Sequence, residues 1–304
     1  MRSVGVGALL CTALMLAAAC HGDRAHTAFD GATALTYVKT QLDFGPRIPN
    51  TDGARRCGDW IIAQMRAHAD TVLVQSWTHT TVDGKQLALR NIIARWRPQA
   101  TDRVLYVTHW DSRPVSDDDP DSTKRALPMP GANDGASGVA LFVELADVLK
   151  RTPPNVGVDL LFVDGEDYGK FEPKEQDVLL GSKYFAAHLP TPDYRPLYGV
   201  LFDMIGQRDL QIYQEGNSVQ RAPEVVTRVW QAAADMGYSD VFIPRGRYTI
   251  NDDHIPLLDA GLRVIDVIDY DYPVHHTTHD TFDQLSARSF QIVGDVATGL
   301  VTGT

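Results

Sequence analysis

Short runs of consecutive apolar residues recur from residue 103 onward, and each run is bounded by polar residues or glycine. Apolarity on successive positions is typical of strands covered on both faces of a sheet. The four runs are residues 103–109, 158–165, 198–206 and 262–269. Two earlier stretches, 71–77 and 91–96, also have strand character, and residues 81–86 between them contain an Asp-Gly that favours a tight turn. The pattern predicts a mixed sheet, antiparallel at this early hairpin and parallel later.

Helical periodicity fills much of the remaining chain, including residues 31–45, 54–68 and 287–301. Residues 133–151 carry one apolar stripe at helical spacing. Its members are Val139, Phe142, Val143, Ala146 and Leu149. Asn133 and Asp134 are suited to cap the start of that helix. Helices alternating with strands predict an α/β fold, specifically a three-layer α/β/α sandwich with a mixed central sheet.

The chain begins with the pattern of an export signal. Arg2 precedes an apolar stretch over 4–19 that ends in small residues and is too short for a comfortable membrane span. We therefore predict a signal peptide at 1–20, a tether at 21–30 and a single catalytic domain at 31–304. Cys20 follows three alanines, which resembles a bacterial lipobox, although ordinary signal cleavage is the alternative. The protein is expected in the periplasm, lipid-anchored at a membrane, or secreted.

Charge and cysteine content limit the chemistry. The net charge of −11 and the absence of a Lys/Arg run argue against nucleic acid as a partner. Cys11 lies inside the signal and Cys20 at its end, so only Cys57 remains in the domain. A lone cysteine forms no internal disulfide and supplies no cysteine-ligated zinc site. Cys57 is predicted to be a buried packing residue, and any metal must be held by histidines and carboxylates.

Polar side chains cluster where the later strands end. In an open α/β sheet, ligands bind outside the carboxyl ends of the strands, so polar residues there carry weight. These residues are His109 and Asp111; Asp164, Glu166 and Asp167; Asp203; and His275, His276, His279 and Asp280, with Asp134 at the start of the following helix. So many carboxylates and imidazoles at one edge would repel one another without a cation among them. Zn²⁺ accepts these ligands and is the simplest explanation.

Five motifs then resemble a known family. They are His109-Trp-Asp111, "GANDGASG" around Asp134, "DGED" at Glu166 and Asp167, "FDMIG" at Asp203 and "HTTHDT" from His276. In this order they resemble the zinc-dependent aminopeptidase family with co-catalytic zinc, from about residue 44 to the end of the chain. They are similar in particular to its bacterial, animal-type glutaminyl cyclase branch, in which a long segment also separates the acidic pair from a later Gly-Ser.

The resemblance implies a role for each matched residue. Asp134, Asp167 and His276 correspond to zinc ligands, and Glu166 to the acid/base. Asp203 and Asp252 correspond to a hydrogen-bonded carboxylate chain behind Glu166. The substrate pocket is less well matched, because the tryptophans of the animal enzymes are lacking after Glu166. Its candidates here are Phe171, Trp110 and Asp266, the last near a position that is histidine in some cyclases.

The function implied is glutaminyl-peptide cyclotransferase, which converts the N-terminal glutamine of a peptide or protein to pyroglutamate and releases ammonia. One zinc is expected, which polarises the amide while Glu166 moves the proton. The alternative is a zinc aminopeptidase that uses one or two zinc ions. His109 and Asp203 would then bind the second zinc with Asp134 bridging, whereas in a cyclase His109 lies behind the ligands. His275 and His279 are expected to be loop residues.

Overall fold

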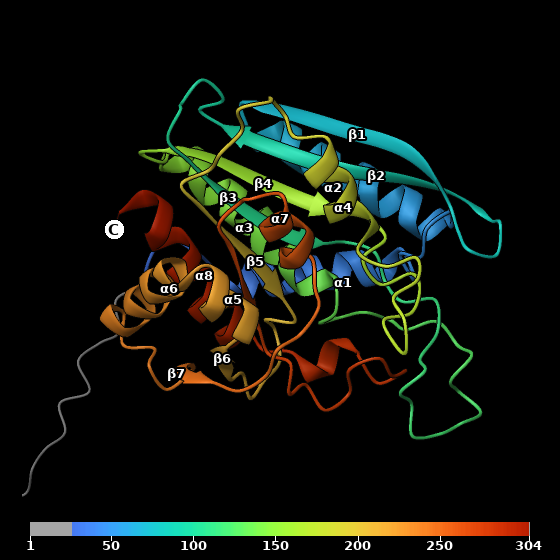
Figure 1. The fold of residues 1–304 in the computed structure, drawn as a ribbon. Helices are drawn as coiled ribbons and strands as arrows, with labels where there is room; N and C mark the ends of the chain where they lie inside the picture. The colour runs from blue at the N-terminus through green and yellow to red at the C-terminus, as the bar shows by residue number, and fades with distance from the viewer. Residues whose placement is uncertain (1–25, 304) are drawn as a thin grey trace, which may run out of the picture.

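The computed structural model describes residues 26–303. Its centre is a six-stranded sheet in the order β1-β2-β4-β3-β5-β8 (Figure 1). These strands are β1 (Thr71–Thr80), β2 (Gln86–Trp96), β3 (Arg103–His109), β4 (Gly157–Val163), β5 (Tyr198–Asp203) and β8 (Val264–Ile268). A separate pair consists of β6 (Ile212–Gln214) and β7 (Phe242–Gly246). The helices are α1 (Gly31–Asp43), α2 (Asp52–His68), α3 (Ala136–Arg151), α4 (Leu180–Ala187), α5 (Gly216–Arg221), α6 (Pro223–Asp235), α7 (His254–Asp259) and α8 (Ala287–Thr302).

The sheet is mixed in the predicted sense. β1 pairs antiparallel with β2 through a hairpin in which Thr80 faces Gln86, and β2 runs antiparallel to β4. β3 is parallel to both β4 and β5, and β5 is parallel to β8. The early antiparallel hairpin and the later parallel strands are therefore confirmed. Because four parallel strands lie side by side, their carboxyl ends meet at one edge of the sheet.

Helices cover both faces of the sheet, which explains the continuous apolar runs. In Figure 1, α4 and α7 lie in front of the strands, and α1, α2 and α3 lie behind them. Alternate strand residues serve the two layers. Tyr106 and Val200 belong to the large core with α3 and α8, while Val107 and Leu201 pack with Phe185 of α4. The three-layer α/β/α sandwich is confirmed.

The start of α3 differs from the prediction. Its N-cap is Gly135, with φ 89°, and it has no side-chain cap hydrogen bond. A Cβ at Gly135 would lie 2.3 Å from the carbonyl oxygen of Asp111, so glycine is required there. Asn133 bonds instead to the turn after β5, and Asp134 faces His109. The capping residues proposed from sequence are thus used to build a site.

The export signal and Cys20 lie outside the described residues. Part of the predicted tether is described, and its His26 and Thr27 bond to the buried Asp295 of α8. Cys57 is fully buried in α2, as predicted, and burial raises the pKa of its thiol to about 12. Within residues 26–303, no helix is long and apolar enough to cross a membrane.

Glu144 of α3 gives a stability prediction. Burial and the nearby Asp147 carboxylate raise the pKa of Glu144 from 4.5 to about 7. The folded state therefore holds a proton that the unfolded chain releases, and stability falls as pH rises from about 4.5 to 7. Glu144→Gln should raise the free energy of unfolding at pH 8 by about 1 to 3 kcal/mol and leave it nearly unchanged at pH 4. Urea titrations at the two pH values check this, and an equal gain at both would contradict it.

Candidate metal centre and active site

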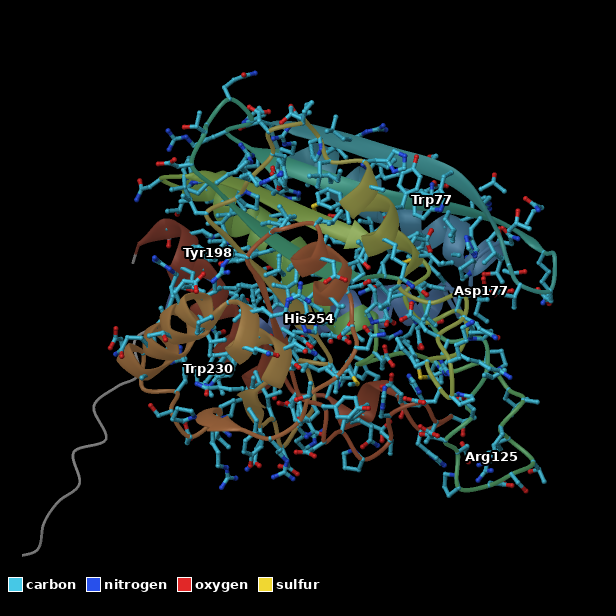
Figure 2. All side chains as sticks on the ribbon, in the orientation of Figure 1. Trp77, Arg125, Asp177, Tyr198, Trp230 and His254 are labelled. Atoms are coloured by element: carbon cyan, nitrogen blue, oxygen red, sulfur yellow. The ribbon has the colours of Figure 1, made fainter. Side chains whose placement is uncertain are left out.

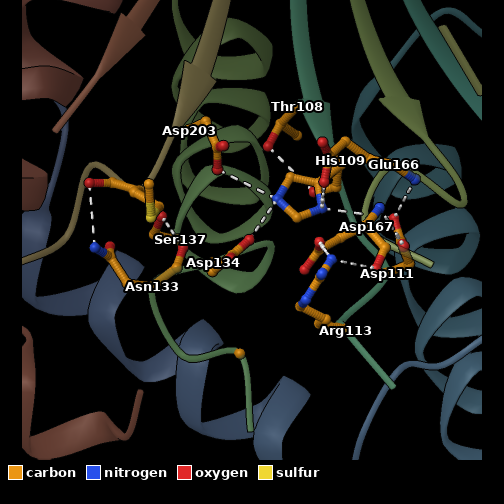
Figure 3. A network of polar contacts seen from close by, with 12 residues as sticks. Thr108, His109, Asp111, Arg113, Asn133, Asp134, Ser137, Glu166, Asp167 and Asp203 are labelled. Carbon is orange, nitrogen blue, oxygen red and sulfur yellow. Dashed lines mark hydrogen bonds and ion pairs between the residues drawn. The ribbon is translucent and has the colours of Figure 1, made fainter. Parts of the chain in front are cut away.

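The carboxyl ends of the parallel strands bring the predicted polar residues together (Figure 3). His109 ends β3 and Asp203 ends β5, while Glu166 and Asp167 follow β4. Asp134 lies just before α3, so its carboxylate reaches the same edge from the turn. The residues arrive from segments far apart in the chain and are fixed by a buried sheet.

Asp134, Asp167 and His276 form one group suited to a metal ion, with ligand atoms all within 4.8 Å of one another. His276 Nε2 lies 3.6 Å from Asp134 Oδ2 and 3.4 Å from Asp167 Oδ1. Asp167 Oδ2 is buried and has no hydrogen-bond partner among the described residues. A buried, unpaired carboxylate oxygen is costly unless a cation neutralises it. Two carboxylates and one imidazole that leave a further position open are a fitting set for catalytic Zn²⁺.

A second group shares Asp134. His109 Nε2 lies 3.0 Å from Asp134 Oδ1 and 3.2 Å from Asp203 Oδ1, and these three residues could also hold a cation. Burial favours the neutral form of Asp134, but the hydrogen bond and charge of His109 outweigh it and hold the pKa of Asp134 below its ordinary value. Figure 3 shows both carboxylates facing the His109 ring. The arrangement suits either a second metal ion or a histidine that orients Asp134.

Glu166 is 6 % exposed and faces the same cavity. Burial raises its pKa well above the ordinary value, and the Asp167 and Asp252 carboxylates act in the same direction. Burial and the nearby Asp203 likewise raise the pKa of Asp252. The hydrogen-bonded chain of Glu166, Asp203 and Asp252 stays a prediction, and neighbouring members of this set already influence one another through charge.

Asp111 holds the acidic pair in place through the backbone. Its two carboxylate oxygens accept hydrogen bonds from the amides of Glu166 and Asp167, at 3.1 and 3.2 Å. Asp111 Oδ1 also lies 3.5 Å from His109 Nδ1. Sequence reasoning had placed Asp111 at the strand end without a role, because its partners are backbone amides in the segment that follows β4.

Arg113 was missed by sequence reasoning. Its guanidinium donates to Asp167 Oδ1 at 2.5 Å and makes two further bonds to Asp117. The side chain is 4 % exposed, so it is a buried cation in direct contact with a candidate ligand. It partly neutralises the acidic edge and leaves Asp167 Oδ2 for a metal. In the sequence, only its place four positions after His109 indicated that Arg113 would lie near the site.

Asp280 orients the turn that carries Asp134. It accepts hydrogen bonds from the Asn133 and Asp134 amides and from the Tyr272 hydroxyl. Asp280→Ala should weaken zinc affinity about 10- to 100-fold, because residues that orient metal ligands typically contribute this much. Tyr272→Phe is the matched control and should keep affinity nearly unchanged, since both amide bonds remain. Competition with a chromophoric chelator measures this; equal zinc affinity in Asp280→Ala and the parent would contradict it.

An open cleft of about 610 Å³ leads to this edge. Its walls include Phe171 and Lys170 from the segment after Asp167, and Tyr270 and His275 from the loop after β8. His275 lies in a loop, as expected, and its ring is tilted against that of His276 with 3.7 Å between centroids. In the sequence, only its position next to the candidate ligand His276 indicated that it would lie near the site.

Two predicted pocket residues do not line this cleft. Trp110 directly follows β3, is 1 % exposed and donates from Nε1 to the carbonyl of Arg90. Asp266 belongs to β8, and its side chain is fully buried next to His254. Of the three pocket candidates, only Phe171 lines the cleft.

Comparison with known proteins identifies relatives of both predicted kinds. The profile described as Peptidase family M28 matches residues 91–301. Among curated proteins, Aminopeptidase YwaD of Bacillus subtilis is 25% identical over 298 residues, covering 89% of this chain. The chain spans only 57% of the length of that aminopeptidase.

Solved structures resemble the chain over nearly its whole length. Porphyromonas gingivalis glutaminyl cyclase is 36% identical with a TM-score of 0.87, over 91% of this chain and 98% of that one. Bacteroides thetaiotaomicron glutaminyl cyclase, solved bound to N-acetylhistamine, is 34% identical with a TM-score of 0.88, over 92% of this chain and 100% of that one.

Proposed function

The chain belongs to peptidase family M28, and from that premise we propose that it is a zinc-dependent glutaminyl-peptide cyclotransferase. The observation that carries the proposal is the similarity to two solved glutaminyl cyclases over more than nine tenths of this chain. The segment between Asp167 and α4 supports the same reading, because it supplies Lys170, Phe171 and Glu172 to the cleft wall.

The residues suit an intramolecular cyclisation. Asp134, Asp167 and His276 would hold the zinc. When bound, zinc supplies Lewis acidity to the side-chain amide carbonyl of an N-terminal glutamine. The α-amine of the same residue attacks that carbonyl carbon, and the ring closes without recruiting a second molecule. No serine or cysteine nucleophile is required, which agrees with the burial of Cys57.

Glu166 moves the proton. It accepts a proton from the attacking amine and donates it to the nitrogen that leaves as ammonia, so it ends the cycle unchanged. Burial raises the pKa of Glu166 above its ordinary value, which favours the protonated form that the donating step requires. Asp252 adds negative charge near Glu166 and favours its protonation, and Asp203 has the same effect on Asp252. The substrates proposed are exported peptides or proteins with a free N-terminal glutamine.

The second candidate function is a metallo-aminopeptidase, favoured by the His109, Asp134 and Asp203 group. Zinc stoichiometry separates the two. A cyclase is expected to bind about one zinc per chain after dialysis, and His109→Ala should leave that number unchanged. Two zinc ions per chain, falling to one in His109→Ala, would favour the peptidase and count against the proposed function.

A further inference from the structure

Behind the cleft wall lies a buried carboxylate–imidazole pair to which the proposed chemistry gives no role. Glu215 precedes α5, and His254 begins α7, where Figure 2 labels it. Both side chains are fully buried, and Glu215 Oε2 lies 3.2 Å from His254 Nε2. Burying polar side chains is costly unless they find partners, so this pair calls for a structural or functional reason.

Glu215 does more than cap a short helix. Its carboxylate accepts from the amides of Asn217 and Ser218, as an N-cap would. It also accepts from the amide of Ile250 at 3.2 Å, 35 positions further along the chain. Despite burial, which opposes ionisation, the adjacent His254 imidazole and the amides of Asn217 and Ser218 lower the pKa of Glu215 to about 2. Glu215 is therefore a buried anion that binds two separate segments.

The segment tied down in this way lines the cleft. Thr249, Ile250, Asn251 and Asp252 all contribute to its wall. Besides the Glu215 bond, Asn217 Nδ2 donates to the Ile250 carbonyl, and the Gly216 amide donates to the Tyr248 carbonyl. His254 fixes the far end of the same segment, two residues after Asp252. Asp252 thus sits between two anchor points that both lead to Glu215.

We propose that the buried Glu215–His254 pair is a positioning element that holds Asp252 against Glu166 during proton transfer. The inference rests on the proposed function, in which Asp252 and the acid/base Glu166 line the same cleft. A simple helix cap needs only a neutral oxygen, such as that of serine or asparagine. The contacts to Ile250 and His254 instead link α5 to the cleft wall. Their loss should affect the chemical step more than substrate binding.

The test is a double-mutant cycle between Glu215→Gln and Asp252→Asn, read by ammonia release from a Gln-initiated peptide. Glu215→Gln should lower kcat about tenfold, because small displacements of catalytic groups are this costly, with KM and zinc content close to the parent. In the Asp252→Asn background the same change should alter kcat less than about twofold, because its effect passes through Asp252. His254→Asn is the second variant and should behave as Glu215→Gln does.

The matched control is Glu224→Gln on α6, an exposed carboxylate paired with Arg263, which should retain the parent kcat. Full kcat in both Glu215→Gln and His254→Asn would overturn the inference. The inference would also be overturned if the kcat losses of Glu215→Gln and Asp252→Asn simply added in the double variant, or if Glu215→Gln lost zinc as well. Either result would mean general structural damage. A parent protein that releases no ammonia would refute the proposed function, and the inference would fall with it.

Discussion

Glu166→Gln is expected to lower kcat for a Gln-initiated peptide about 10³-fold while the protein keeps its zinc, because general acid–base catalysis commonly contributes 10²- to 10⁴-fold. Glutamine is close in shape to glutamate, so the buried position at the end of β4 should remain filled. It neither accepts a proton from the attacking amine nor donates one to the leaving ammonia. The proposed ligands Asp134, Asp167 and His276 are untouched, so zinc should remain bound.

The experiment combines steady-state ammonia release with zinc analysis of the same sample. Glu224→Gln serves as the control, since it removes an exposed carboxylate far along the chain from the site. A rate near that of the parent would remove Glu166 from the mechanism. Loss of zinc in the variant would instead make Glu166 part of the metal site.

The second large effect is expected for His276→Ala, which should lose zinc on dialysis and unfold more easily. His276 is the only imidazole of the Asp134–Asp167–His276 group, and its Nε2 faces both carboxylates. Without it, two buried carboxylates must share a cation or repel each other. Because ligand binding stabilises the folded state, losing saturating zinc should lower the free energy of unfolding by about 3 kcal/mol.

Zinc content and thermal unfolding with and without added zinc measure this effect. His279→Ala is the matched control, because His279 is exposed in the same loop and belongs to none of the metal-binding groups found among the described residues. The parent and His279→Ala should gain stability from zinc, and His276→Ala should not. Normal zinc content in His276→Ala, with a loss in His275→Ala, would move the ligand to the neighbouring histidine.

The sheet and the edge at which polar residues meet could be predicted because both follow from local patterns. Runs apolar on consecutive positions require cover on two faces, and parallel strands bring their carboxyl ends together. His109, Asp167 and Asp203 could therefore be expected at one edge from their positions alone. Resemblance to a family then separated His276 from the other histidines of its loop, which spacing could not do.

The rest depended on contacts between distant segments. Trp110 looked available beside His109, but its side chain is buried and donates to the Arg90 carbonyl of β2. Arg113 pairs with Asp167, 54 positions away, and His254 pairs with Glu215, 39 positions away. Such pairings follow from how loops pack over the sheet, and a single sequence carries no pattern for them. Asp134 was expected to cap α3, but the glycine after it takes that position.

The most direct test of the central claim is to incubate the zinc-loaded mature domain with one Gln-initiated and one Leu-initiated peptide and to read the products by mass. The account predicts that the first peptide loses ammonia, about 17 Da, by ring closure, while the second stays intact. Shortening of either peptide by its first residue would contradict the account and identify the protein as an aminopeptidase.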